Sequence, residues 1–208
     1  AFPALSLLAG RQENENFIKN LSSTVRQILF FIIPLTVIFL LLRAQIVRII
    51  LGTGAFDWSD TIQTDDSLSY FSFFLFAQSL LALLVRAYYA WEDTKTPFII
   101  SIITVIINIS LNLLFTKTSW NMGVSGLALA YSIASIINFA LLWVFMKFKL
   151  GKMDEGRILI AVGKFSIAGF FMAIAIQGCK YFLAPFVDMQ KFWGIFTQGF
   201  ISGLVGCL

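Results

Sequence analysis

Long apolar runs alternate with short polar segments along this 208-residue chain. A helix needs about 20 mostly apolar residues to cross the hydrocarbon core of a bilayer. Runs near that length predict six membrane spans, roughly at residues 24–42, 68–90, 97–115, 124–148, 158–182 and from 192 to the end of the sequence, where we expect the sixth to be truncated. The predicted fold is an all-α, polytopic transmembrane helix bundle.

The polar segments suggest how the spans are connected and oriented. Residues 11–23 predict a polar helix on the membrane surface, residues 45–51 predict a short interfacial helix, and residues 57–66 predict an acidic loop with four aspartates. Cytoplasmic loops usually hold an excess of Lys and Arg. If the N-terminus is cytoplasmic, the cytoplasmic side has eight Lys and Arg residues near span ends and the outer side has five. The eight are Arg11, Lys19, Arg26, Lys95, Lys147, Lys149, Lys152 and Arg157. The five are Arg43, Arg48, Lys117, Lys180 and Lys191. We therefore predict a cytoplasmic N-terminus and an outward-facing acidic loop.

Composition supports the membrane assignment and narrows the chemistry. The chain is 59% hydrophobic and 12% charged, whereas a typical soluble domain is about 25% charged. The net charge of +4 is explained by loop anchoring, so no nucleic-acid partner is expected. With no histidine and two distant cysteines, His-based catalysis, a zinc cluster and a disulfide framework all lack their parts. No catalytic residue and no ATP-binding loop is predicted.

Polar residues in the third predicted span form a stripe. Ser101, Thr104, Asn108 and Asn112 fall within an arc of about 80° at 100° per residue, so they share one helix face. The stripe has two interpretations. It could be one wall of a polar cavity, with amide oxygens placed for a cation, or it could form hydrogen bonds between helices.

The second predicted span has polar residues at seven-residue intervals. Ser72, Ser79 and Arg86 therefore line up along one helix face. The Arg86 guanidinium suits an anionic substrate group such as phosphate. The alternative to substrate binding, which we favour, is a structural role in which Arg86 extends to the lipid headgroups or pairs with Glu92 or Asp93.

The fourth predicted span has small residues every four positions. Gly126, Ala130 and Ala134 lead to Asn138 on the same face, and such a row lets helix backbones approach closely. We expect helix packing here. The complete set of substrate-cavity candidates from the spans is Arg86, Ser79, Ser72, Ser101, Thr104, Asn108, Asn112 and Asn138.

A charged turn, RAYYAWEDTKTP (residues 86–97), separates the second and third spans. We expect Thr96 to cap the following helix with its hydroxyl. Pro97 would then occupy the first helical position, where a missing N–H costs nothing.

Four segments together resemble a known family. FPALS (2–6), IVRIILGTGAF (46–56), RAYYAWEDTKTP (86–97) and GVSGLALAYS (123–132), in this order and spacing, are similar to the MurJ/MviN lipid II flippases of the multidrug/oligosaccharidyl-lipid/polysaccharide exporter superfamily. The resemblance covers nearly the whole chain. It implies the C-terminal portion of a fourteen-helix, two-lobed fold, with residues 1–150 as helices nine to twelve and residues 151–208 as the last two helices, which form a lipid-tail groove.

The resemblance also implies a function. It predicts a transporter, not an enzyme, that moves the undecaprenyl-diphosphate-linked peptidoglycan precursor from the inner to the outer leaflet of the bacterial cytoplasmic membrane by alternating access. Membrane lipids and cell-wall synthesis proteins are the further partners expected. The alternatives are an exporter of another lipid-linked saccharide or of drugs in the same superfamily, and a non-transporting membrane scaffold.

Some members of this family are thought to bind sodium, which would be the only cofactor. The matching positions are Asn108, Asn112, the Val124 carbonyl and Ala128. The sequence has an amide at position 112, where an acid could be expected, and no hydroxyl at position 128.

Overall fold

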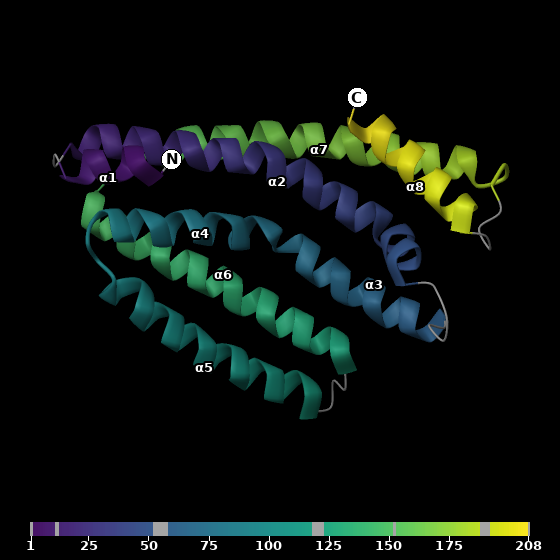
Figure 1. The fold of residues 1–208 in the computed structure, drawn as a ribbon, viewed down its shortest axis with the longest axis horizontal. Coiled ribbons are helices and arrows are strands. Elements are labelled where there is room, and N and C mark those ends of the chain that lie inside the picture. Colours follow the sequence, from purple (N-terminus) through teal and green to yellow (C-terminus); the bar gives the residue numbers. More distant parts are fainter. Residues whose placement is uncertain are drawn as a thin grey trace.

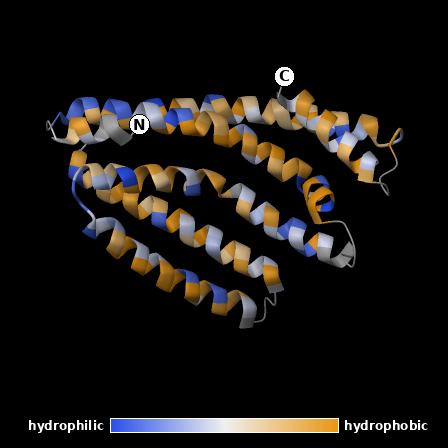
Figure 2. Cartoon of the chain, in the orientation of Figure 1, coloured by the Kyte–Doolittle hydropathy of each residue, from blue (hydrophilic) through white to orange (hydrophobic). Residues whose placement is uncertain are grey.

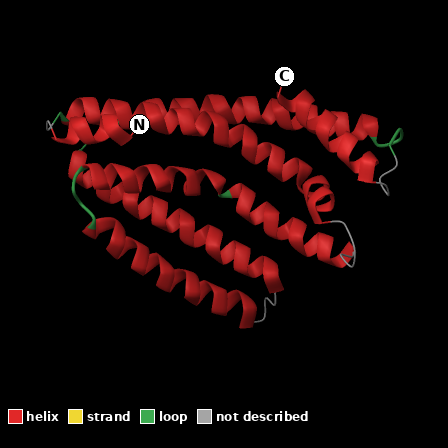
Figure 3. Cartoon of the chain, in the orientation of Figure 1, coloured by secondary structure: helices red, strands yellow, loops and turns green. Residues whose placement is uncertain are grey.

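The computed structural model describes residues 2–10, 13–51, 58–117, 123–151, 153–187 and 192–207. All regular structure in these ranges is helical (Figure 3). The helices are α1 (Phe2–Gly10), α2 (Asn14–Leu51), α3 (Trp58–Phe73), α4 (Leu75–Ala90), α5 (Lys95–Lys117), α6 (Gly123–Leu150), α7 (Glu155–Leu183) and α8 (Phe192–Cys207).

Four of these helices, α2, α5, α6 and α7, are long and apolar enough to cross a membrane, and the bent pair α3–α4 makes a fifth span if it is counted as one. The sixth predicted span corresponds to α8, whose 16 residues fall short of the length of about 20 that a span needs. The all-α, multi-pass bundle is confirmed.

The helix α2 is longer than predicted. It runs unbroken for 38 residues, a length of about 57 Å, so residues 14–23 and 45–51 extend the first span instead of forming separate surface helices. No glycine interrupts this sequence, and Pro34 lies inside the helix, as apolar membrane helices tolerate. The predicted acidic loop is also wrong in part, because Asp60, Asp65 and Asp66 belong to α3, while Asp57 lies outside the described residues.

The second predicted span is broken. Its two parts, α3 and α4, meet at an angle of 45° near Phe74. The hydroxyls of Ser69 and Ser72 donate to the carbonyls of Asp65 and Leu68, four residues earlier, and such bonds within a helix often bend it. The bend means that Ser72 does not continue the stripe of Ser79 and Arg86.

The helices pack around α2 (Figure 1). The helices α2 and α7 lie side by side and run in the same direction. The helix α4 lies against the first half of α2, and α6 packs against α4. Their shared core includes the fully buried Phe17, Leu84, Tyr88 and Leu142. The hydropathy colouring in Figure 2 shows apolar residues along the helices and hydrophilic ones concentrated near their ends.

The turn between α4 and α5 is organised by Asp93. Its carboxylate accepts hydrogen bonds from the Thr96 backbone N–H (3.1 Å) and hydroxyl (3.0 Å), and it pairs with Lys149 at 2.9 Å. The helix begins at Lys95. Thr96 is therefore not the cap and Pro97 is not the first helical residue, because the helix begins two residues before Pro97 and the Asp93 carboxylate accepts from the Thr96 N–H.

Candidate functional site

A small polar pocket lies between α4, α5 and α6. It has a volume of about 220 Å³, and its polar lining comes from all three helices: Gln78, Thr104, Asn108, Tyr131, Ser135 and Asn138. The helix α5 contributes because its polar stripe faces inward while its apolar residues, such as Ile102, Val105 and Ile109, are exposed. A helix at the edge of a membrane bundle is expected to turn its polar side chains toward the bundle and its apolar side chains toward the lipid.

Several amide atoms at this site have no partner. The side chain of Asn112 donates from Nδ2 to Oδ1 of Asn108 at 2.8 Å. Among the described residues, Asn108 Nδ2, Asn112 Oδ1 and Asn138 Oδ1 are buried without a hydrogen bond. Buried polar groups normally find a partner or an ordered water, so these atoms can receive water or the hydroxyl and amide groups of a bound molecule.

The other polar lining residues of the pocket are already hydrogen-bonded. Gln78 Nε2 lies 2.5 Å from the Tyr131 hydroxyl and 3.4 Å from Ser135 Oγ. The Thr104 hydroxyl donates to the Ser101 carbonyl at 2.9 Å. The described lining of the pocket is therefore neutral, and its amides and hydroxyls are suited to hydrogen bonding.

The eight residues predicted from the sequence do not form a single site. Thr104, Asn108 and Asn138 line the pocket, and Asn112 joins it through Asn108. Ser101 instead lines a separate depression with Tyr89 and Lys95, at the start of α5.

The three candidates from the second predicted span lie apart from this pocket. Ser72 is buried and its hydroxyl is bonded to Leu68, and Ser79 is half-buried. Arg86 is exposed. The part of the chain that the structure describes contains no ion pair between Arg86 and Glu92 or Asp93, since Asp93 is paired with Lys149.

The small-residue row of α6 packs as expected. Gly126, Ala130 and Ala134 are buried. Val124, whose carbonyl is a predicted sodium ligand, is the second residue of this helix and has an exposed side chain. None of the described hydrogen bonds or pockets joins Val124 to Asn108 or Asn112.

Sequence analysis missed three polar lining residues: Gln78, Tyr131 and Ser135. A usable signal was present for two of them, because Tyr131, Ser135 and Asn138 follow the i, i+4, i+7 spacing of one helix face. Gln78 is on another helix, and only the packing of α4 against α6 brings it to the site.

A second polar network, also missed, lies toward the other end of the bundle. Arg43 Nε on α2 pairs with Asp65 Oδ2 on α3 at 3.1 Å, and Lys180 Nζ on α7 donates to the Leu41 carbonyl at 2.7 Å. The buried Gln45 and Gln198 bond to each other at 3.1 Å. This network connects α2 with α3, α7 and α8.

Comparisons with known proteins agree with this architecture. A protein family described as "Lipid II flippase MurJ" matches residues 1–197. The chain is 34% identical over 144 residues to the "Probable lipid II flippase MurJ" of Thermotoga maritima, covering 69% of the chain and 29% of that protein. It is 28% identical over 205 residues to the Vibrio cholerae protein of the same name, covering 98% and 38%.

A solved structure supports the same assignment. The structure titled "Lipid II flippase MurJ, inward closed conformation" superimposes with a TM-score of 0.72 at 29% identity, covering 98% of this chain and 40% of that one. The chain thus spans 29% and 38% of the two relatives' lengths. With nearly its whole length matched by the family and by this fold, the chain belongs to the lipid II flippase MurJ family.

Proposed function

We propose that this chain is the C-terminal portion of a lipid II flippase, which moves the undecaprenyl-diphosphate-linked peptidoglycan precursor from the inner to the outer leaflet by alternating access. The observation that carries the proposal is the agreement over nearly the whole chain with both the family and a flippase structure.

Within this function, the pocket of α4, α5 and α6 would serve the hydrophilic part of the cargo or the water that accompanies it. The free atoms of Asn108, Asn112 and Asn138 support this role, because amides hydrogen-bond well to the hydroxyl and amide groups of a saccharide–peptide headgroup. Thr104 and Ser101 need no contact with the cargo to explain their presence, because the Thr104 hydroxyl donates to the Ser101 carbonyl within α5.

The lipid tail requires an apolar path. A cavity of about 750 Å³ lies among α2, α4, α6 and α7, lined mainly by residues such as Leu29, Ile33, Phe76, Phe139 and Phe170. We propose that this cavity is part of the tail path. The predicted groove between the last two helices remains a prediction, since α7 lines this cavity and the described part of α8 does not.

Sodium coupling also remains a prediction. Asn112 Oδ1 is an unpartnered oxygen of the right kind, but Asn108 Oδ1 already accepts a hydrogen bond, and the four matching positions include no carboxylate. These residues fit sodium poorly, so we derive no step through the ion.

We place the protein in the bacterial cytoplasmic membrane with the N-terminus of this segment inside. Support comes from Lys95, Lys147, Lys149 and Arg157, which the fold gathers at the end of the bundle where α2 begins. Cell-wall synthesis proteins are expected partners of the full-length protein.

Complementation tests the proposal. The full-length gene is expressed in cells depleted of their own lipid II flippase, and growth is measured together with membrane insertion. We expect growth to recover. If growth does not recover although the protein is correctly inserted, another exporter activity of the superfamily is favoured. If growth still recovers after the cargo-binding residues of the whole protein are replaced, a scaffold is favoured.

A further inference from the structure

We propose that the outer face of α2 and α7 holds a binding site for the headgroup of an anionic phospholipid of the surrounding bilayer. The site is a surface groove of about 560 Å³, within the range of about 300–1,000 Å³ usual for small-molecule sites. It contains three cations, Arg26, Arg157 and Lys164, and no acidic residue among its lining. We call it the basic groove.

Helix geometry creates the basic groove. On α2, Ser23, Arg26, Gln27 and Phe30 follow the spacing of one helix face, and on α7 so do Arg157, Ala161 and Lys164. The two helices run side by side in the same direction. Ser22 Oγ donates to Asp154 Oδ2 at 3.4 Å, and Lys180 bonds to Leu41 further along. The two faces therefore meet along one seam.

The cations are available to a ligand. Lys164 is exposed, and the described contacts give it no ion pair. Arg26 is half-buried, and its described hydrogen bond runs from Nε to the Ser22 carbonyl at 3.3 Å. Arg157 lies 3.5 Å from Asp154 with its side chain 64% exposed, a weak surface pair that a phosphate can outcompete. The nearby Glu155 is engaged by Lys147 at 2.8 Å.

The cations of the basic groove lie at the depth in the membrane where lipid headgroups are found. The part of α2 that follows Arg26 is about 37 Å long, slightly more than the hydrocarbon thickness of about 30 Å. Arg26 therefore lies near the boundary between headgroups and acyl chains. Lys164 is deeper on α7, but helix side chains point toward the N-terminus, so its ammonium reaches back toward the same boundary.

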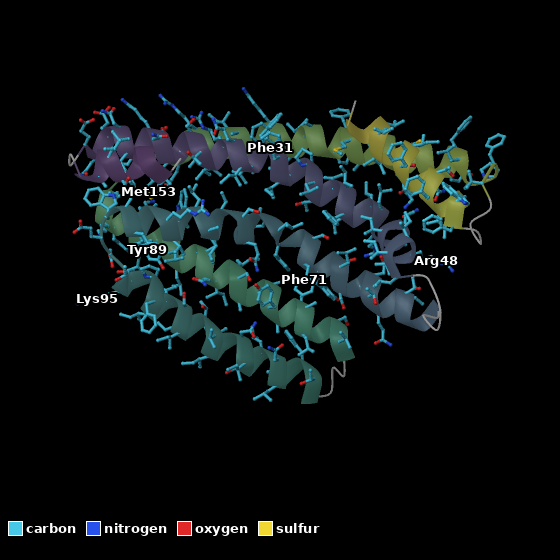
Figure 4. All side chains as sticks on the ribbon, in the orientation of Figure 1. Phe31, Arg48, Phe71, Tyr89, Lys95 and Met153 are labelled. Atoms are coloured by element: carbon cyan, nitrogen blue, oxygen red, sulfur yellow. The ribbon has the colours of Figure 1, made fainter. Side chains whose placement is uncertain are left out.

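The groove also offers a surface for the acyl chain. Phe30 and Phe31 are 54% and 70% exposed, and Phe30 packs edge-on against Phe165 with ring centroids 5.5 Å apart. Figure 4 labels Phe31 on α2, where α7 runs alongside. Cations above an aromatic surface match a phosphate above an acyl chain, and basic pockets between membrane helices are known to bind such headgroups.

Lipid binding by the purified full-length protein tests the proposal, independently of transport. Phosphatidylglycerol and phosphatidylcholine with identical chains are titrated, and bound lipid is counted by native mass spectrometry. We expect preference for phosphatidylglycerol, and a loss of about tenfold in its affinity for Arg26→Gln/Lys164→Gln. Lys95→Gln, an exposed lysine at the same end of the bundle (Figure 4), should change the affinity by less than about twofold.

Other outcomes decide against the proposal. Equal binding of both lipids by the wild type, or an unchanged affinity in the double variant, would overturn it. If millimolar inorganic phosphate displaces phosphatidylglycerol as effectively as unlabelled lipid does, the groove is a plain anion site. If equimolar undecaprenyl diphosphate displaces phosphatidylglycerol, the groove belongs to the cargo. Because folding could suffer in the double variant, Lys164→Gln alone is measured too, and its exposed side chain makes loss of the fold a poor explanation for weaker binding.

Discussion

The hydroxyl of Tyr88 on α4 donates a hydrogen bond of 2.9 Å to the backbone carbonyl of Leu142 on α6. Both residues are almost fully buried, so this bond fixes the register of two helices that border the polar pocket. We predict that Tyr88→Phe lowers the free energy of unfolding by about 1 kcal/mol. Thermal unfolding of the full-length protein in detergent measures it. Tyr89→Phe is the control, because the neighbouring ring is 49% exposed, and an equal loss in both variants would refute the explanation.

Asp93 should make stability depend on pH. Burial alone would raise the pKa of Asp93, but hydrogen bonds from Lys149 and Thr96 outweigh it and hold the pKa below the ordinary value of 3.8. A lowered folded-state pKa means that the stabilisation is complete above the unfolded-state pKa and is lost as the pH falls through the folded-state pKa.

Asp93→Asn should therefore cost up to about 1 kcal/mol near neutral pH, because the amide can still accept from Thr96 but loses the charge that pairs with Lys149. The variant should also unfold with a shallower acid dependence than the wild type. Denaturation curves at several pH values between neutrality and the acid range measure this. Glu92→Gln, an exposed neighbour, should keep the wild-type slope. A wild-type slope in Asp93→Asn would contradict the assignment.

Replacing an unpartnered amide of the polar pocket tests whether the pocket contacts the cargo or serves only helix packing. Asn138→Leu removes a buried acceptor that has no described partner, so we expect little loss of stability but a fall in flippase activity of about tenfold, the effect of losing one good hydrogen bond in the transported complex. Ser110→Val, at an exposed position of α5, should leave activity unchanged. Full activity in Asn138→Leu would make the pocket a packing feature only.

Orientation is testable with single cysteines after Cys179 and Cys207 are replaced by serine. We predict that Lys95→Cys is shielded from membrane-impermeant thiol reagents added outside intact cells. Asp66→Cys should be labelled, because the position is exposed on α3, the helix that begins at the opposite end of the bundle. The reverse pattern would invert the topology.

Sequence patterns predicted the features that depend on local periodicity. The polar face of α5 and the small-residue face of α6 both point inward, because the spacing of residues on a helix determines which of them share a face. The predicted interface helices failed for a related reason. Polarity changes along α2, but nothing in its sequence between Asn14 and Leu51 ends a helix.

Features that lack a breaker residue in the sequence, or that depend on two distant segments, were not predicted. The break between α3 and α4 occurs near Phe74 without a glycine or proline to signal it. The pairing of Arg43 with Asp65 requires α3 to lie against α2, and the place of Gln78 in the pocket requires α4 to lie against α6. The periodicity of one segment contains no information on its neighbours.

Movement of lipid II itself tests the central claim most directly. Cells depleted of their own flippase express the full-length protein, and the fraction of lipid II accessible to an externally added, membrane-impermeant degrading enzyme is measured. We predict that accessible lipid II returns to the level of undepleted cells. If lipid II remains in the inner leaflet although the protein is inserted in the membrane, this protein is not a lipid II flippase.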